Sequence, residues 1–360
     1  MSDVLVIGAG VVGAACAYYA ARAGLSVTVV DRGGVAGGTT GAGEGNILVS
    51  DKEPGPELDL ALRSRELWRS LEVSGFEWEP KGGLVVAASS PELDALSLLA
   101  EAQRSRGVLA ESVAPASYEP HLNPSLHGGY FYPQDAQVQP MLAAARLLAA
   151  SGATLRLNTT VRGIEEGLVH TDRGTLRAPA IVNAAGVWAG TWPGLELPVL
   201  ARRGFILVTG RSAAGLVRHK VYAAGYVAGV GSSSADLQTS PVVEGTRAGT
   251  ILIGASRERV GFDASFSLPV LRALAINAVW LFPALAKVPV IRAYRGFRPY
   301  TPDHLPIVGA DPRMPGLFHA TGHEGAGVGL APATGEAIAR LITGSAPAVP
   351  LEPFSPARFL

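Results

Sequence analysis

The 360-residue sequence predicts an α/β protein of mixed α+β character, in which a dinucleotide-binding unit is interleaved with a second domain. Three observations support this fold class. An apolar strand, a glycine-rich turn, a helix and a second strand follow one another over residues 4–32. Short strand patterns fill much of residues 154–254. A further strand, glycine-rich turn and helix occupy residues 316–342, so the two kinds of unit alternate along the chain.

Residues 4–32 (VLVIGAGVVGAACAYYAARAGLSVTVVDR) combine the parts of a βαβ dinucleotide fingerprint. Gly8 allows a tight turn, Gly10 lets the backbone approach a pyrophosphate, and Gly13 lets the helix pack closely on the strand. The helix N-terminus offers N–H groups to phosphates, and Asp31 stands where a carboxylate can accept hydrogen bonds from a ribose. Two other interpretations are a signal or membrane segment and a βαβ unit without a ligand. An acidic residue in place of a basic region, and three interrupting glycines, argue against the first.

The helices and strands after residue 32 are predicted from apolar periodicity and from the glycines and prolines that mark turns between them. The expected helices cover residues 57–71, 91–106, 141–150, 269–282 and 332–342. The expected strands cover residues 83–88, 154–157, 160–164, 168–171, 181–183, 204–209 and 250–254, with a strand and turn over 128–138.

Composition excludes several classes of protein. With 48% hydrophobic and 17% charged residues the chain is compact and globular, and 30 basic against 30 acidic residues argue against binding to nucleic acid. The single cysteine, Cys16, is expected to be a buried small hydrophobe, which leaves no disulfide within the chain and no cysteine-rich metal site. The histidines show no metal-ligand spacing, so no metal is expected. Because no signal or transmembrane segment is recognised, the cytoplasm is the expected location.

Four further stretches narrow the cofactor. Residues 37–41 (GGTTG) offer hydroxyls and bare backbone soon after the ribose acid, and residues 181–187 (IVNAAGV) end a strand in small residues that admit a flat ring. Residues 295–309 (RGFRPYTPDHLPIVG) place Arg298 where a strand passes into a proline-lined loop. Residues 316–330 (GLFHATGHEGAGVGL) give a second glycine-rich turn before a helix, whose N-terminus could stabilise negative charge on a reduced flavin.

Together these stretches resemble the D-amino-acid oxidase/glycine oxidase/sarcosine oxidase family of FAD-dependent amine oxidoreductases, over essentially the whole chain. TTGAGEGN at 39–46, HKVY at 219–222, GASRERVGFD at 254–263 and ATGHEGAGVGLAPATG at 320–335 are more narrowly similar to one group. These are the FAD-carrying beta subunits of heteromeric dehydrogenases that act on D-hydroxyproline, opines and, in hydrogen cyanide synthase, glycine.

The resemblance implies a glutathione-reductase-like FAD-binding domain over residues 1–80, 138–202 and 296–360. It also implies a substrate-binding domain over residues 81–137 and 203–295, built on a mixed, largely antiparallel sheet that roofs the flavin. Non-covalent FAD is expected, because the only cysteine lies in the first helix and residues 37–50 contain no histidine that could tether a flavin.

The resemblance also implies roles for residues at matching positions. Gly8, Gly10, Gly13 and Asp31 would hold the ADP half of FAD. The other expected cofactor contacts are Arg32, Thr39, Thr40, Gly45, Asn46, Val161 (or its neighbour Arg162), Ala185, Gly186, Gly322, Gly325, Ala326 and Gly327.

At the substrate end, Arg298 matches the arginine that clamps a substrate carboxylate, a task for which a planar guanidinium is suited. His323 and Glu324 are catalytic candidates that could polarise the flavin or contact the substrate amine. A purely structural role at the glycine turn is an equal alternative for both residues. Tyr222 and Tyr226 are candidate roof residues that bind substrate, although aromatics on such strands are more often core.

The expected reaction is hydride transfer from the α-carbon of a small amino or imino acid to flavin N5. The chain has only four lysines, so the lysine that activates oxygen in some oxidases has few candidates, which favours a dehydrogenase. Electrons could then leave through partner subunits that carry an electron-transfer centre. The alternatives are an oxygen-using oxidase of glycine, sarcosine or a D-amino acid, a non-catalytic FAD-bearing subunit and, from the first motif alone, an NAD-dependent dehydrogenase.

Overall fold

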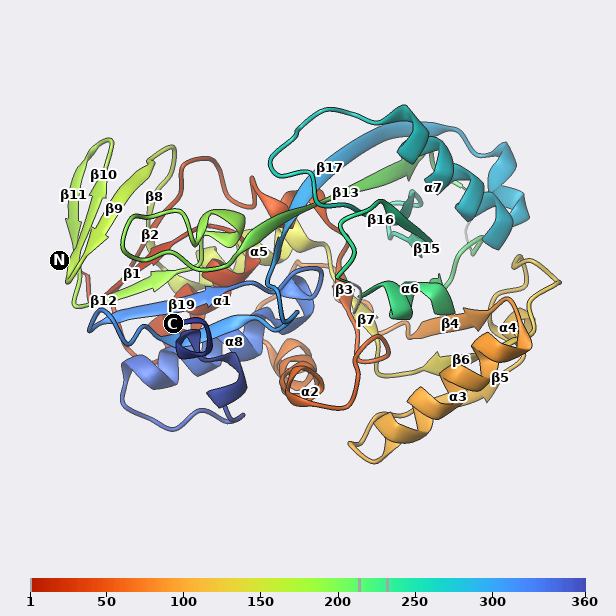
Figure 1. Cartoon of the computed structure of the whole chain (residues 1–360), viewed down its shortest axis with the longest axis horizontal. Helices are drawn as coiled ribbons and strands as arrows, with labels where there is room; N and C mark the ends of the chain where they lie inside the picture. The colour runs from red at the N-terminus through yellow and green to blue at the C-terminus, as the bar shows by residue number, and fades with distance from the viewer. Residues whose placement is uncertain (1, 213–214, 231–232) are drawn as a thin grey trace.

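The computed structural model describes residues 2–212, 215–230 and 233–360 and contains two main β-sheets, joined through two long strands (Figure 1). The six-stranded sheet has the order β18-β19-β12-β1-β2-β8. Its strands are β1 (Val4–Ile7), β2 (Val27–Val30), β8 (Thr154–Arg156), β12 (Ala180–Asn183), β18 (Ile307–Ala310) and β19 (Leu317–Thr321). All neighbours are parallel except β18, which runs antiparallel to β19. Both β1 and β12 are buried along their whole length, as continuous apolar strands covered on both faces should be.

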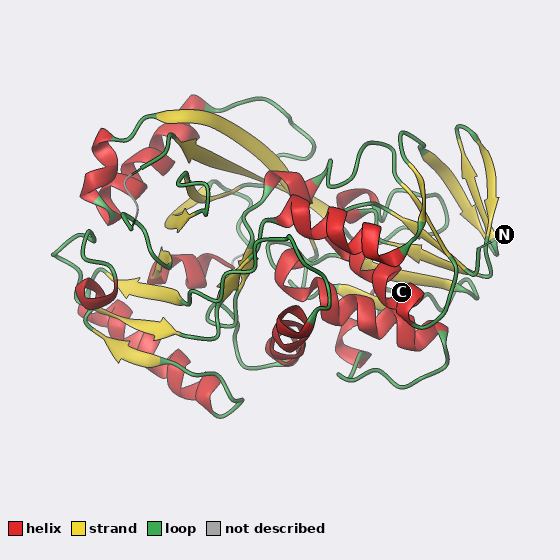
Figure 2. Ribbon diagram, turned by 180° about the vertical axis from the view of Figure 1, so that it is seen from behind, coloured by secondary structure: helices red, strands yellow, loops and turns green. Residues whose placement is uncertain are grey.

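Helices α1 (Val11–Arg22) and α8 (Gly327–Ile342) pack on the strands of this sheet. Helices α5 (Pro140–Ser151) and α2 (Pro56–Ser70) pack on those two helices, and Figure 2 shows helices in front of the strands. Helix α1 packs against α8 and α5, and α2 packs against α8. Small residues allow the first of these contacts, since a Cβ at Gly335 would lie 2.6 Å from the backbone of Ala15. The alanine- and glycine-rich sequences of both helices are therefore explained by their close crossing.

The eight-stranded sheet has the order β17-β13-β16-β15-β14-β4-β6-β5, and only its β14–β4 pairing is parallel. Its strands are β4 (Gly83–Ala87), β5 (Glu111–Val113), β6 (Gly128–Tyr132), β13 (Leu200–Thr209), β14 (Lys220–Ala223), β15 (Gln238–Gly245), β16 (Ile251–Arg257) and β17 (Val290–Tyr300). Helix α7 (Leu268–Leu281) packs on β13, β15 and β16, and α3 (Ser90–Arg104) packs on β4 and β6. The predicted mixed, largely antiparallel sheet is confirmed.

Smaller elements complete the described chain. A two-stranded sheet joins β3 (Asn46–Ile47) to β7 (Ala136–Gln137). A three-stranded sheet contains β9 (Val161–Glu165), β10 (Leu168–Thr171) and β11 (Gly174–Arg177). The short helices are α4 (Pro115–Tyr118) and α6 (Ala224–Val230), and the 3₁₀ turns are η1 (Thr39–Ala42), η2 (Gly186–Trp188), η3 (Pro283–Lys287), η4 (Glu352–Phe354) and η5 (Pro356–Phe359). Within the described ranges no helix is long and apolar enough to cross a membrane.

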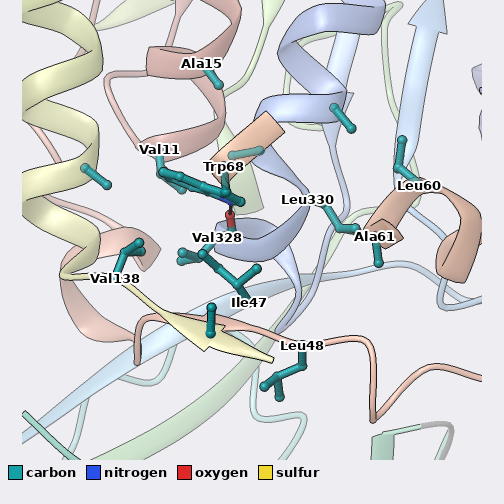
Figure 3. Close-up of a cluster of buried hydrophobic side chains, with 14 of the residues drawn as sticks. Val11, Ala15, Ile47, Leu48, Leu60, Ala61, Trp68, Val138, Val328 and Leu330 are labelled. Carbon is teal, nitrogen blue, oxygen red and sulfur yellow. Dashed lines mark hydrogen bonds between the residues drawn. The ribbon is translucent and has the colours of Figure 1, made fainter. Parts of the chain in front are cut away.

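The predicted helix over residues 332–342 begins earlier than expected. Helix α8 starts at Gly327, so Pro332 lies inside it and not at its first turn. A proline has no N–H to donate to the carbonyl four residues before it, which here is the carbonyl of Val328. The indole Nε1 of Trp68, on α2, donates to that oxygen at 3.1 Å (Figure 3). A side chain from another helix therefore replaces the missing backbone hydrogen bond.

A second side chain of α2 supports the same helix. The hydroxyl of Ser64 donates to the carbonyl of Gly329 at 2.6 Å and accepts from the backbone N–H of Ala333 at 3.2 Å. Ser64 and Trp68 are both buried, and Trp68 belongs to the main hydrophobic cluster shown in Figure 3. The first two turns of α8 are thus stabilised from outside. The five residue ranges predicted for the two domains remain predictions.

Candidate functional site

A cavity of about 390 Å³ lies between the two sheets. It is lined by the turn between β1 and α1, by the end of β17 and by the start of α8. Most of the residues predicted from the sequence to bind cofactor or substrate line this cavity. They are Gly8, Gly10, Gly13, Asp31, Arg32, Thr39, Thr40, Asn46, Val161, Ala185, Gly186, Tyr226, Arg298, His323, Glu324, Gly325 and Gly327.

The turn between β1 and α1 has the geometry that the glycine pattern predicts. Gly8 has a φ of +112°, and a Cβ there would lie 2.3 Å from the carbonyl oxygen of Ala184. A Cβ at Gly13 would lie 2.0 Å from the carbonyl oxygen of Gly8. Any larger residue at either position would therefore force the turn away from α1 or from β12. The N-cap of α1 has no side-chain hydrogen bond of its own, and the hydroxyl of Thr40 accepts from the N–H of Val11 at 3.0 Å.

Asp31 is fixed at the end of β2 by backbone donors. One carboxylate oxygen accepts from the N–H of Ala9 and the other from the N–H of Gly33, both at 2.7 Å. A carboxylate has further lone pairs, so Asp31 can still accept from a ribose on its cavity side. Beside it the guanidinium of Arg32 lies 3.4 Å from the ring centroid of Trp188, which also lines the cavity. Trp188 was not singled out from the sequence, although it directly follows the IVNAAGV stretch.

Two buried acceptors lie beneath the cavity wall. In the described part of the chain, Oε1 of Glu44 and Oδ1 of Asn46 have no hydrogen-bond donor. Both residues line the cavity, and Nδ2 of Asn46 donates to the other oxygen of Glu44 at 3.0 Å. A Cβ at Gly254 would lie 2.7 Å from Oε1 of Glu44, so this oxygen packs against β16 and is not open to the cavity. The bare glycine wall at Gly8 and Gly13, together with the ribose acid Asp31, is what fits the ADP part of FAD.

The turn before α8 forms another part of the wall. Gly322 and Glu324 both have positive φ, at +75° and +47°, and the N–H of Glu324 donates to the carbonyl of Pro299 at 2.9 Å. This hydrogen bond fixes the turn to the end of β17. The N-cap of α8, Ala326, makes no side-chain capping hydrogen bond. The helix therefore presents its N-terminal N–H groups toward the cavity that Gly327 and Val328 line.

Arg298 extends along the cavity between two glycines. Its Nη1 donates to the carbonyl of Ser256 at 2.8 Å, which leaves the other nitrogen donors of the fork for a ligand. A Cβ at Gly204 would lie 2.2 Å from Nη1, and a Cβ at Gly325 would lie 3.8 Å from Nε. The missing side chain at Gly204 therefore makes the space that the guanidinium occupies, whereas a methyl group at Gly325 would only be in ordinary contact with it.

His323 is a buried neutral imidazole. Burial lowers its pKa to about 3, and its Nε2 lies 3.0 Å from the hydroxyl of Thr334 on α8. The ring therefore carries no positive charge near neutral pH. Glu324 is ion-paired, with Oε1 at 2.5 Å from Nη1 of Arg202 and Oε2 at 3.2 Å from Nδ1 of His304. Burial opposes the ionisation of Glu324, but His304 and Arg202 hold its pKa below the usual value. These contacts support a structural role for His323 and Glu324 at the glycine turn before α8. The catalytic roles of both residues remain predictions.

Four predicted residues do not line the main cavity. Tyr222 is fully buried, and its hydroxyl contacts that of Ser50. Gly45 is in close contact with the backbone of Val138, and Gly322 with Thr301. Ala326 lines a small adjoining pocket that shares Tyr226 with the main cavity.

Two expectations about the rest of the chain concern metals and Cys16. The described residues contain no group of three or more histidine, cysteine or acidic side chains that could hold a metal ion. Cys16 is buried in α1 as expected, and burial raises the pKa of its thiol to about 12. Sequence reasoning placed residues 43–46 along the cofactor, and Glu44 lines the cavity. It missed the buried ion pairs of Glu44 and Glu244 with Lys220, because residues so far apart in the chain give no local signal.

Comparison with known proteins identifies relatives over the whole chain. The bifunctional protein ThiO/ThiG of Nostoc sp. is 32% identical over 94% of this chain, but the chain spans only 52% of that protein. Glycine oxidase of Geobacillus kaustophilus is 31% identical, with 99% of this chain and 97% of that protein covered. Hydrogen cyanide synthase subunit HcnC of Pseudomonas aeruginosa is 30% identical, with 99% and 96% covered.

Solved structures agree with these relatives. Glycine oxidase from Geobacillus kaustophilus superimposes with a TM-score of 0.90 at 29% identity, covering 100% of this chain and 99% of the other. L-Proline dehydrogenase from P. horikoshii gives a TM-score of 0.89 at 25% identity, with 99% and 97% covered. The family model described as FAD dependent oxidoreductase (DAO) matches residues 3–341. The chain therefore belongs to the DAO family of FAD-dependent oxidoreductases, and FAD is its cofactor.

Proposed function

We propose that this protein oxidises the C–N bond of a small amino or imino acid and that it is a dehydrogenase. A hydride leaves the α-carbon of the free amine, and the resulting iminium ion loses its proton to solvent and is hydrolysed by water. Non-covalently bound FAD, held by the Gly8–Gly13 turn, Asp31 and the start of α8, would supply the two-electron acceptor. The side chains and backbone of this chain bind both molecules and hold them in reacting orientation.

The observation that carries this proposal is the position of Arg298. Arg298 lines the cavity, with one nitrogen of its guanidinium used by the backbone and the others available. A planar fork binds a carboxylate through two parallel hydrogen bonds, which orients the α-carbon as well as holding it. The bare glycines on either side leave the fork accessible. A small α-amino or α-imino acid suits this arrangement.

The cavity offers no ready proton acceptor for the amine. Among the acidic and histidine side chains that line its described part, Glu324 and Glu44 are ion-paired and Asp31 belongs to the nucleotide end. His323 is neutral, but its Nε2 contacts Thr334. The substrate is therefore expected to react as the free amine, whose lone pair assists departure of the hydride.

The relatives of this chain support a small amino or imino acid as the substrate. Glycine oxidase, L-proline dehydrogenase and a hydrogen cyanide synthase subunit share the fold or the sequence over nearly the whole chain. HcnC is described as a subunit, which supports a chain that passes electrons to partner subunits. Together with the motifs at 39–46 and 320–335, this favours a D-proline, hydroxyproline, glycine or opine substrate.

The first experiment uses the purified, yellow protein under anaerobic conditions. A panel containing D-proline, L-proline, D-hydroxyproline, glycine, sarcosine and opines is screened for bleaching of the flavin absorbance. We expect at least one to bleach it, and air to restore the colour slowly while an added dye restores it at once. A protein that binds FAD but is bleached by none would contradict the proposal.

The second candidate function is an oxygen-using oxidase, which the high similarity to glycine oxidase favours. Fast recolouring in air, with one hydrogen peroxide formed per substrate oxidised, would establish it in place of the dehydrogenase. A third candidate, a FAD-bearing subunit without its own catalysis, predicts that Arg298→Met leaves the turnover of the assembled complex unchanged.

Arg298→Met tests the carboxylate clamp directly. We expect kcat/KM to fall by a factor that corresponds to several kcal/mol, on the order of a broken buried charge pair, with FAD content unchanged. Arg295→Met is the matched control, since Arg295 lies on the same strand and donates to the carbonyl of Ala264 outside the cavity lining. Equal activity of the two variants would refute the assignment.

A further inference from the structure

Arg257, the last residue of β16, is a buried arginine without an anionic partner. It is 7% exposed, and its guanidinium makes no hydrogen bond or ion pair with the described residues. Its nitrogens are not among the fully covered atoms that lack a partner, so the guanidinium keeps some accessible surface. Burial lowers the pKa of Arg257, but a guanidinium stays protonated. Because a buried charge without a counter-ion is costly, we expect an anionic ligand nearby.

The acids around Arg257 and its neighbour Arg298 already have other partners. The two arginines repel each other, and neither forms an ion pair in the described part of the chain. Among the acids that attract them, Glu324 pairs with Arg202 at 2.5 Å, Asp51 with Lys52 at 2.8 Å, and Glu44 with Lys220 at 2.7 Å. The two lysines are each shared with a second acid, Glu57 and Glu244, and burial raises the pKa of both.

The alternation of side chains along β16 places Arg257 on the cavity side of the sheet. Ala255 lines the cavity, and Arg257, two residues later, leaves the same face of the strand. Nη1 of Arg298 donates to the carbonyl of Ser256, the residue between them, at 2.8 Å. The guanidinium of Arg298 therefore lies beside the end of the strand that carries Arg257.

Tyr226, on α6, connects Arg257 to the cavity. Its ring centroid lies 4.9 Å from Cζ of Arg257, and Tyr226 lines the cavity whereas Arg257 does not. The hydroxyl of Tyr226 has no partner among the described residues and is not fully covered, so it can donate to a ligand. Gly325 adjoins both sides of this site. It lines a small pocket together with Tyr226, and a Cβ there would lie 3.8 Å from Nε of Arg298.

We propose that the substrate carries two carboxylates, one on each side of its nitrogen, and that Arg298 binds the first while Tyr226, backed by Arg257, binds the second. N-(carboxyalkyl) amino acids, the class to which opines belong, have this form. The hydroxyl of Tyr226 donates to the second carboxylate, and the charge of Arg257, which solvent screens little at a buried position, attracts it. The proposal rests on the proposed function for the oxidation itself and narrows its substrate to a diacid.

The first test compares the binding of two ethers that cannot be oxidised as amines. Oxydiacetate has the shape of iminodiacetate, and methoxyacetate has that of sarcosine, which lacks the second carboxylate. Calorimetry on the FAD-bound protein should show oxydiacetate binding at least about tenfold more tightly, as one charge-assisted hydrogen bond would give. Under turnover, iminodiacetate should exceed sarcosine in kcat/KM in the same way. Equal affinity for the two ethers would overturn the proposal.

Two variants test where the second carboxylate binds. Tyr226→Phe removes the hydroxyl and keeps the ring, and Arg257→Met removes the charge and keeps an unbranched side chain. In each variant we expect the ratio of the two ether affinities to fall toward one. Arg292→Met is the matched control and should keep the wild-type ratio, since Arg292 lies 5.9 Å from the ring of Tyr294 and outside the cavity lining. A wild-type ratio in both Tyr226→Phe and Arg257→Met would refute the assignment.

Bleaching of the flavin separates a failure of this proposal from a failure of the proposed function. If sarcosine or another monocarboxylic amino acid bleaches the flavin and iminodiacetate does not, the proposed diacid is wrong and the proposed function stands. If no amino acid of either kind bleaches it, the proposed function fails, whatever the ratio of the two ether affinities.

Discussion

Trp68→Phe tests whether a side chain of α2 repairs the gap that Pro332 leaves in α8. The substitution keeps an aromatic ring at a fully buried position but removes the Nε1–H that donates to the carbonyl of Val328 at 3.1 Å. The carbonyl oxygen then has no donor, because the proline four residues later has none. Helix α8 begins with Gly327 and Val328, both in the cavity wall, so the change should reach the cofactor site.

The expected loss can be estimated from its two parts. A buried carbonyl left without a donor costs about 1–3 kcal/mol. Loss of the second ring of the indole adds roughly 1 kcal/mol of packing energy, because part of the space closes again. We therefore expect the free energy of unfolding to fall by about 2–4 kcal/mol in total. Thermal unfolding of the apoprotein, followed by circular dichroism, measures it.

A double-mutant cycle isolates the hydrogen bond from the packing. Pro332→Ala supplies a backbone N–H that can donate to the carbonyl of Val328, so Trp68→Phe should cost less in that background. The difference should match the hydrogen-bond part, about 1–3 kcal/mol. If Trp68→Phe costs the same in both backgrounds, the indole contributes only packing and the explanation of the buried proline fails.

Three other predictions concern single positions. Gly204→Ala places a methyl group against Nη1 of Arg298, so the KM for substrate should rise while FAD content, read from absorbance, stays unchanged; an unchanged KM would show that the guanidinium moves freely. Asp31→Asn should weaken FAD binding by about tenfold or more, because the amide loses the charged acceptor for ribose, and equal affinity in a fluorescence titration would contradict this. Burial raises the pKa of Asp135 from 3.8 to about 7, so its folded form binds a proton that the unfolded chain releases, and stability falls as pH rises from about 4 to 7. Asp135→Asn should therefore unfold at a higher temperature than the wild type at pH 8 and at the same temperature near pH 4.

The parts of the fold that could be predicted are those with a local physical cause. Residues 4–32 carry the whole βαβ unit in one stretch, and steric contacts at Gly8 and Gly13 explain why the pattern is so specific. Helices α2, α3, α5 and α7 lie within one or two residues of their predicted ranges, because their apolar periodicity is strong. The start of α8 was wrong, since proline at the first helical turn is the commoner arrangement.

The parts that could not be predicted depend on pairing across the chain. Strands β14 and β15 were not assigned, because they gain stability from pairing with neighbours in the eight-stranded sheet and not from a local pattern. Lys220 lies 176 positions from Glu44, and Trp68 lies 260 positions from Val328, so neither contact leaves a periodic or spacing signal. Tyr222 and Tyr226 show the same limit: four residues apart, the first is fully buried and the second lines the cavity.

The order of strands in the six-stranded sheet has a consequence for biosynthesis. Strand β1 lies between β2 and β12, and β12 in turn pairs with β19, near the other end of the sequence. While a ribosome is still making β13 to β17, β12 has only β1 as a neighbour, and its open edge is free to pair with other strands. The hydroxyl of Thr39 likewise donates to the carbonyl of Phe297, 258 positions later. The cofactor cavity, which also requires Gly325 and Gly327, is therefore complete only after nearly the whole chain has been made.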